Sequence, residues 1–285
     1  MAMVLTEAVD AADPTHRLVT RRADGEAGDA SPIQAENRAV SVLMDYGSAV
    51  HLELDPEHDQ YETVRRELER VPDSVCLFPG SENEFRASLP EGRAVVESVL
   101  EVPGGAKASS DAFTFRMFSV ARFAVVTDQS WLYRSVPHET HVREINAVGH
   151  EGAIADLNAT LAHVRESAVV PFGGLTSWTV DGVTYSLDWD ALHRSRDGTD
   201  VRCDITRLRQ VTVLSSEPSL RFDWAPAGEA SGLRRVVSRV LGSERASPPT
   251  RVEIPAGSDG DEIAGAFREL RAKLGYTYDV ETPAE

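Results

Sequence analysis

The stretch Trp178-Thr-Val-Asp-Gly-Val-Thr-Tyr-Ser-Leu-Asp-Trp189 decides how the fold of this chain is interpreted. Apolar and polar residues alternate on both sides of Asp181-Gly182, a dipeptide that strongly favours a two-residue β-hairpin turn. Alternation with a period of two is typical of a strand with one buried face. The stretch therefore predicts a hairpin with strands over 177–180 and 183–189.

The residues after this hairpin continue the β pattern and then change to a helical one. Further strands are predicted over 200–205, 210–214 and 220–224. The segment 259–274 is predicted to be a helix, and Gly275 suits the position just after its end. Its apolar residues recur at helical spacing and form one face: Ile263, Phe267, Leu270 and Leu274.

Over 168–278 the order of these elements resembles a prokaryotic pleckstrin-homology-like (PH-like) domain. The resemblance is carried by the hairpin, by Asp204-Ile-Thr-Arg-Leu-Arg-Gln-Val-Thr-Val213, by Leu220-Arg-Phe-Asp-Trp224 and by the closing helix. It implies an α+β fold in which a strongly bent antiparallel sheet is closed by a C-terminal helix. It also implies binding of lipid headgroups, peptides or other proteins, and the family has no shared catalytic residues to carry over.

The preceding residues, 36–167, are predicted to form a mixed α+β domain. The segment Phe123-Ala-Val-Val-Thr-Asp-Gln-Ser-Trp-Leu-Tyr-Arg134 resembles two strands of the same family. One interpretation is a divergent second PH-like copy over 71–167, in tandem with the first, and the other is a different α+β fold. Strands are expected over 39–44, 50–54, 75–78, 94–102, 113–126, 131–134 and 141–148, with the first two paired as a hairpin, and helices over 56–71 and 151–166.

The two ends of the chain are interpreted as tails. Residues 1–35 are acidic and rich in alanine and glycine, which is typical of a disordered segment, and 279–285 form a short second tail. The start of the chain lacks the basic and apolar regions of a signal peptide. No apolar run approaches the ~20 residues that a membrane-spanning helix needs. The sequence therefore predicts a cytoplasmic protein without a transmembrane segment.

The charge of the chain is strongly negative. Lys and Arg number 29 against 46 Asp and Glu, so the net charge is 29 − 46 = −17. Lys107 and Lys273 are the only lysines, which leaves 29 − 2 = 27 arginines. The composition resembles that of proteins from halophilic archaea, and a high-GC actinomycete is the alternative source. The negative charge argues against a general nucleic-acid binder, whose affinity comes from neutralising phosphates.

A salt dependence of stability follows from this charge. Molar salt shortens the Debye length to about 3 Å and screens repulsion among acidic side chains. The free energy of unfolding is therefore expected to be higher in molar KCl than in dilute buffer. Urea unfolding under the two conditions measures the difference, and the opposite order would contradict the halophilic interpretation.

Motifs for catalysis, metal binding and nucleotide binding are absent from the sequence. It contains neither a phosphate-binding Gly-x-x-x-x-Gly-Lys loop nor a Gly-x-Ser-x-Gly nucleophile motif. His138-Glu139-Thr140-His141 is interpreted as a solvated loop rather than a metal site. Cys76 and Cys203 are isolated and are interpreted as small buried apolar residues. We therefore expect no cofactor, no metal and no catalytic residue, although an enzyme with a composite site is left open.

One basic segment interrupts the acidic chain, Gly232-Leu-Arg-Arg-Val-Val-Ser-Arg-Val-Leu-Gly-Ser-Glu-Arg245. Its apolar residues follow helical spacing, so an amphipathic helix is predicted where the PH-like pattern has a plain loop. Three interpretations stay open: a helix covering the open end of the sheet, a docking surface for an acidic partner, or a contact with a membrane surface or nucleic acid. The residues that would bind the partner are Arg234, Arg235, Arg239 and Arg245.

These observations favour a non-catalytic adaptor or scaffold. It would bind a protein partner through the PH-like domain and the basic helix over 232–245. Peripheral membrane contact stays open, nucleic-acid binding is disfavoured, and the oligomeric state is not specified by the sequence. The alternatives are a DNA-associated regulator, a structural component of a viral or cellular assembly, and the enzyme mentioned above.

Overall fold

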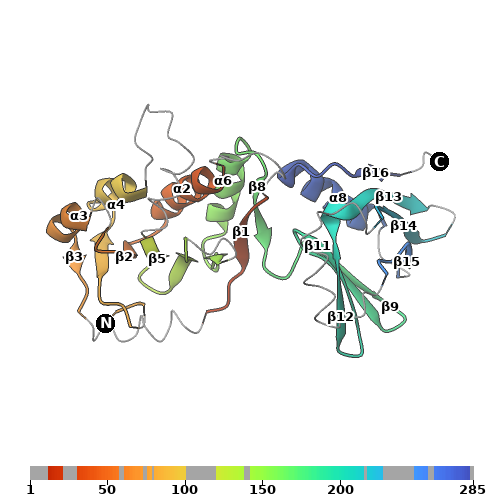
Figure 1. Ribbon diagram of the computed structural model, residues 1–285, viewed down its shortest axis with the longest axis horizontal. Coiled ribbons are helices and arrows are strands. Elements are labelled where there is room, and N and C mark those ends of the chain that lie inside the picture. Colours follow the sequence, from red (N-terminus) through yellow and green to blue (C-terminus); the bar gives the residue numbers. More distant parts are fainter. Residues whose placement is uncertain are drawn as a thin grey trace. The chain divides into compact units, whose positions relative to one another are not determined.

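The structure is a computed structural model, and it describes residues 12–21, 31–57, 61–72, 76–78, 80–100, 120–137, 142–214, 217–226, 247–255 and 260–282 (Figure 1). The chain divides into two compact units, Met1–Phe172 and Gly173–Glu285. Both combine helices with largely antiparallel sheets, so the fold class is α+β. No helix among the described residues is long and apolar enough to cross a membrane.

The first unit is built on one antiparallel sheet with the strand order β3-β4-β2-β5-β6-β7-β1-β8. Strand β1 lies between β7 and β8, so residues 16–20 are part of the sheet. Leu18 on this strand is 1% exposed. The strands are β1 (His16–Thr20), β2 (Ala49–Leu54), β3 (Glu69–Arg70), β4 (Glu84–Ser88), β5 (Val120–Val126), β6 (Trp131–Ser135), β7 (Arg143–Ile145) and β8 (Ser167–Pro171).

The main core of this unit lies between the sheet and its helices. These are α2 (Ser31–Met44), α3 (Tyr61–Glu67), α4 (Arg93–Leu100) and α6 (Glu151–Leu161), and Figure 1 shows them gathered on one side of the sheet. Strand residues of alternate position and helix residues of one face meet in a single apolar cluster. Its fully buried members include Leu43, Leu52, Phe85, Phe123 and Leu157.

A charged pair lies inside this core. Nε of Arg143 on β7 is 2.9 Å from Oε2 of Glu36 on α2, and each side chain is 2% exposed. The hydroxyl of Tyr133 donates a hydrogen bond of 2.9 Å to the other carboxylate oxygen of Glu36. Burial, with the charge of Glu36, raises the pKa of Tyr133 well above its usual value. The phenol therefore stays protonated and keeps donating to the carboxylate.

A second buried carboxylate fixes a loop on the opposite face of the sheet. Glu84 on β4 accepts hydrogen bonds of 2.9 Å from the backbone N–H groups of Leu77 and Phe78. Its Oε1 also lies 2.6 Å from Nδ1 of His51 on β2. Leu77 and Phe78 pack in a small apolar cluster with Trp131 on this face. By binding their backbone N–H groups, the carboxylate keeps the loop with these two residues packed against the sheet.

Several predictions for the first unit are wrong. Residues 39–44 and 94–102 were expected to be strands, but 39–44 lie in α2 and the described residues 94–100 lie in α4. β2 pairs with β4 and β5 instead of forming a hairpin with 39–44. Within the predicted 1–35 tail, β1 is a sheet strand and α2 begins at Ser31. The described residues of 75–78 form no strand, and among the described residues of the predicted helix over 56–71 only those of α3 are helical.

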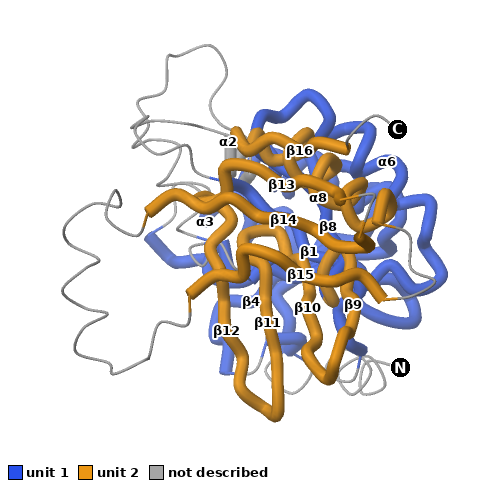
Figure 2. The backbone as a smooth tube through the Cα atoms, turned by 90° about the vertical axis from the view of Figure 1, so that its right-hand side faces the viewer, with its two compact units in different colours: residues 1–172 blue, residues 173–285 orange. Residues whose placement is uncertain are grey.

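In its described residues, the second unit consists of two four-stranded sheets and one α-helix. The first sheet is an antiparallel meander in the order β12-β11-β10-β9, and the second has the order β15-β14-β13-β16. Figure 2 shows the strands of the two sheets crossing. The elements are β9 (Thr176–Val180), β10 (Val183–Leu187), β11 (Ala191–Arg196), β12 (Thr199–Asp204), the 3-10 turn η2 (Ile205–Arg207), β13 (Leu208–Leu214), β14 (Ser219–Trp224), β15 (Arg251–Glu253), α8 (Gly260–Leu274) and β16 (Asp279–Glu281).

Two Asp-Gly turns shape the first of these sheets. Asp181 and Gly182 have φ values of 49° and 73°, and Asp197 and Gly198 have 49° and 78°. Positive φ at both central residues is the type I′ arrangement that matches strand twist, and aspartate and glycine tolerate it. The first turn confirms the hairpin predicted from the sequence. The second joins β11 to β12, and β11 was not predicted.

Helix α8 packs its apolar face onto the second sheet, as its spacing predicted. Ile263, Phe267, Leu270 and Leu274 are each at most 4% exposed. The Phe267 ring lies 5.8 Å from that of Phe222 on β14, measured between centroids. The helix ends before Gly275, whose φ of 66° suits the residue after a helix.

The boundary between the units differs from the predicted one. β8 pairs with β1 and belongs to the first unit, so the division falls after Phe172 and not before residue 168. The predicted tail over 279–285 contributes β16 to the second unit. The first unit has one eight-stranded sheet and the second has two four-stranded sheets, so their described strands do not repeat one arrangement.

Candidate anion-binding pocket

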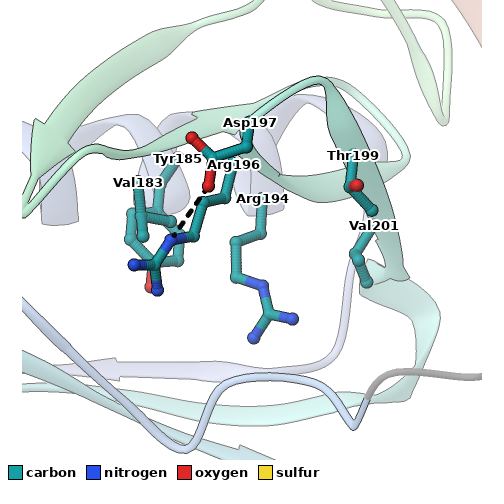
Figure 3. A pocket seen from close by; sticks show the side chains of 7 residues that line it. All are labelled: Val183, Tyr185, Arg194, Arg196, Asp197, Thr199 and Val201. Atoms are coloured by element: carbon teal, nitrogen blue, oxygen red, sulfur yellow. Dashed lines mark ion pairs between the residues drawn. The ribbon is translucent and has the colours of Figure 1, made fainter.

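A pocket of about 510 Å³ opens on the second unit, on one face of its first sheet. Strands β10, β11 and β12 and the turn between the last two supply its lining (Figure 3). The lining residues are Val183, Tyr185, Arg194, Arg196, Asp197, Thr199 and Val201. Six of them come from strands, so the hydrogen-bonded ladder fixes where their side chains begin.

Strand periodicity explains why these side chains meet. Residues two apart in a strand point to the same face, which brings Arg194 and Arg196 together on β11. In the ladder, Arg194 lies opposite Tyr185 on one side and Val201 on the other. Arg196 lies opposite Thr199. The hairpin turn at Asp197-Gly198 therefore sets the register that assembles the pocket.

Two stacked aromatic side chains lie beside the arginines. Tyr185 and Trp178 are 9% and 5% exposed, and their rings stack with centroids 5.6 Å apart and an angle of 19° between planes. Tyr185 lies between Trp178 and Arg194 in the cross-strand register. Because stacked, buried rings have little rotational freedom, Tyr185 keeps a fixed position opposite Arg194.

The two arginines differ in their partners. Nε of Arg196 lies 3.7 Å from Oδ2 of Asp197, but these side chains are 66% and 91% exposed, so solvent screens the pair. Arg194 has no ion pair with any residue that the structure describes. Figure 3 shows its guanidinium extending into the pocket, between Arg196 and the side of Thr199 and Val201. The pocket therefore presents a positive group to a ligand.

This set of groups suits binding of a small anionic group. A guanidinium presents a planar fork of donors that matches a carboxylate or a phosphate. The hydroxyls of Tyr185 and Thr199 add polar groups, while Val183 and Val201 supply apolar surface. The lining contains neither histidine nor cysteine.

Neighbouring residues with catalytic potential are not among the residues that line the pocket. His193 precedes Arg194 on β11, so its side chain is on the opposite face, where Nδ1 lies 3.1 Å from Oδ2 of Asp200. Cys203 is buried, and burial raises the pKa of its thiol. A thiol with a raised pKa is a poor nucleophile at neutral pH. The residues that line the pocket thus suit the binding of an anion.

The partner-binding residues predicted from the sequence lie outside the residues that the structure describes: Arg234, Arg235, Arg239 and Arg245. His138 and His141 lie outside them as well. In the described part of the chain, no group of three or more potential metal ligands comes together.

Sequence analysis missed Arg194 and Arg196, although a signal was present. The segment Ala191-Leu-His-Arg-Ser-Arg-Asp-Gly198 ends in the same Asp-Gly dipeptide that identified the first hairpin. Two arginines with one residue between them just before such a turn predict a pair on one face of a strand. Their proximity to Tyr185 depends on strand pairing, which the segment alone does not contain.

Comparison with known proteins gives no indication of function, so the geometry of the pocket is the main guide to it. No family model, no curated protein and no solved structure matches this chain.

Proposed function

We propose that this protein is a non-catalytic adaptor that binds an acidic segment of a protein partner in the Arg194–Arg196 pocket. The single observation that carries the proposal is Arg194 itself. Its guanidinium projects into a pocket beside stacked aromatic rings, with no carboxylate paired to it among the described residues. In a chain of net charge −17, carboxylates are plentiful, so an arginine that lines a pocket and forms no ion pair with any described residue suits a ligand's anion.

The order of elements in the second unit supports the PH-like interpretation. Four meandering strands, β9 to β12, are followed by the antiparallel set β13 to β15 and then by helix α8. The two sheets cross, and α8 packs on the second of them. Domains of the family that this order resembles bind ligands and have no common catalytic residues. The resemblance therefore fits a binding role, to which the pocket gives a location.

Charge favours an acidic protein segment over a membrane or a nucleic acid. A lipid surface and a nucleic acid are extended polyanions, and a chain of net charge −17 repels them at long range. Inside the pocket, Asp197 would also oppose a densely charged phosphate array. One or two carboxylates on a protein segment meet Arg194 with less repulsion. The basic segment 232–245 is proposed as a further contact for the same partner. The proposed setting is a cytoplasmic, salt-rich one.

Capture of the partner tests this function. The tagged full chain is used to isolate partners from its native host in moderate salt, alongside Arg194→Gln and the control Arg202→Gln. Arg202 is on the opposite face of the sheet and pairs with Asp190. A charge-assisted hydrogen bond contributes about 1.5–3 kcal/mol, so Arg194→Gln is expected to weaken capture about tenfold to a hundredfold.

The control is expected to retain capture, which separates loss of the pocket from loss of charge. Circular dichroism of all three proteins checks that the fold is unchanged. Equal capture by the native chain and Arg194→Gln would remove the pocket from the proposed function.

A further inference from the structure

The outer edge of β13 is covered by the chain's own last strand. β16 pairs with β13 in parallel, with Gln210 opposite Asp279, Val211 opposite Val280 and Thr212 opposite Glu281. β13 is itself an interior strand, since its other side pairs with β14 along Leu208 to Leu214. Figure 2 shows β16 at the rim of this sheet, next to β13. β16 therefore occupies a site at which a strand can add to the sheet.

The side chains of β16 contribute little to holding it there. Asp279 and Glu281 are exposed, and Val280 is only partly buried. The preceding residues differ sharply, since Tyr276 and Tyr278 are 5% and 1% exposed. The hydroxyl of Tyr278 donates a hydrogen bond of 2.8 Å to the carbonyl oxygen of Phe267 on α8. Buried side chains thus fix the chain up to Tyr278, whereas the residues after it are held mainly by backbone pairing and exposed polar contacts.

The side-chain contacts of this last segment are polar and involve two arginines of α8 and Asp261, whose Oδ1 accepts a hydrogen bond of 3.4 Å from the Thr282 hydroxyl. Nη1 of Arg271 lies 3.3 Å from Oδ1 of Asp279. Nη2 of Arg268 donates a hydrogen bond of 2.5 Å to the hydroxyl of Thr282. The Arg271–Asp279 side chains are 45% and 65% exposed, so the pair adds little stability. The contacts nonetheless define a preference, because an arginine beside the edge favours an acidic residue in the added strand.

The edge also extends beyond the strand that covers it. β13 runs from Leu208 to Leu214, whereas β16 pairs only with Gln210 to Thr212. Among the described residues no strand pairs with Val213 or Leu214 on this side. A longer extended segment would form more ladder hydrogen bonds than the three-residue β16. Backbone pairing of this kind supplies affinity without needing a deep side-chain pocket.

We propose that the β13 edge is a second docking site, for an extended acidic segment of a protein partner, and that β16 covers it until that segment displaces it. The partner segment lies parallel to β13 and places an acidic residue beside Arg271. β16 detaches while Tyr276 and Tyr278 stay anchored. This site is separate from the Arg194–Arg196 pocket and does not depend on the function proposed for it.

The test uses the chain truncated after Tyr278 and a fluorescent peptide with the sequence of residues 279–285. An attached strand competes at an effective concentration near the millimolar range, so the full chain should bind the peptide roughly tenfold more weakly than the truncated chain. Hydrogen exchange at the β13 amides should quicken on truncation and slow again when peptide is added. Arg271→Glu in the truncated chain should weaken binding about fivefold or more, because a like charge replaces one partner of the exposed pair, and the control Arg251→Glu, on β15 at the far edge, should leave binding unchanged.

A second variant covers the case in which truncation unfolds the protein. Asp279→Arg in the full chain keeps the backbone but places two arginines face to face, which should free the edge and strengthen peptide binding. Peptide binding that neither variant improves would overturn the proposal. So would dimerisation of the truncated chain without peptide binding, because the edge would then belong to a second copy.

Discussion

Replacing Arg143 with leucine is expected to lower the free energy of unfolding of the first unit by about 3–5 kcal/mol. The substitution leaves the carboxylate of Glu36, which is 2% exposed, inside the core without its cation. Tyr133 would still donate one hydrogen bond, but a single neutral donor does not offset the cost of burying a charge. Because of the buried pair, the stability of the first unit depends strongly on the residue at position 143.

Calorimetry of the full chain measures this effect, with hydrogen exchange assigning the transition to the first unit. Glu36→Leu combined with Arg143→Leu should restore much of the loss, since no charge is then buried. Arg134→Leu is the matched control, because its pair with Glu144 is partly exposed and should be worth under about 1 kcal/mol. Equal destabilisation by Arg143→Leu and Arg134→Leu would contradict the assigned role of the buried pair.

Phe267→Ala is expected to destabilise the second unit by about 3–5 kcal/mol. The ring belongs to a residue of α8 and is fully buried. It contacts the rings of Phe222 and Tyr278, at centroid distances of 5.8 and 6.2 Å. Truncation leaves a cavity between the helix and the second sheet. Among the described residues α8 is the one α-helix of the second unit, so the loss falls on the whole unit.

Measuring the unfolding transition of each unit separately tests this effect. Phe267→Ala should lower the transition of the second unit and leave the first unchanged, since Phe267 has its contacts in the second. Glu269→Ala, on the exposed side of the same helix, is the control and should change the free energy of unfolding by less than about 0.5 kcal/mol. A shift below 1 kcal/mol for Phe267→Ala would mean that α8 is not a core element.

The second unit is the part that the sequence predicts well, because its signals are local. An Asp-Gly turn specifies its own hairpin, and the apolar spacing of 259–274 specifies its helix without reference to other segments. The predicted strands over 210–214 and 220–224 are confirmed as β13 and β14. The parallel addition of β16 was not predicted, because it depends on a partner strand far away in the sequence.

In the first unit, tertiary packing outweighs local preference. Ala39-Val40-Ser41-Val42-Leu43-Met44 contains two β-branched valines, which favour a strand. In the structure its buried residues, Ala39, Val40, Leu43 and Met44, recur at helical spacing and face the sheet. His16–Thr20 lies in an acidic stretch, so its place between β7 and β8 could not be inferred from composition. Such pairing follows from contacts between distant segments.

In the candidate site, too, local features could be predicted from the sequence and contacts between distant segments could not. Spacing and the Asp-Gly turn place Arg194 and Arg196 on one face of a strand, which is a local inference. That Tyr185 and Val201 lie opposite Arg194 comes only from pairing with β10 and β12. The stacking of Trp178 on Tyr185 likewise joins two strands. A basic pair was therefore predictable from sequence, but a pocket was not.

The most direct test of the account is a titration of the full chain with a hexaglutamate peptide, followed by NMR of the arginine Nε–H signals. The Arg194 signal is assigned by its loss in Arg194→Gln, and Arg202 on the opposite face is assigned in the same way. The account predicts a saturable shift of the Arg194 signal, with the Arg202 signal unchanged and no saturation in Arg194→Gln. Equal shifts at both arginines, or none at Arg194, would contradict binding of acidic segments in the pocket.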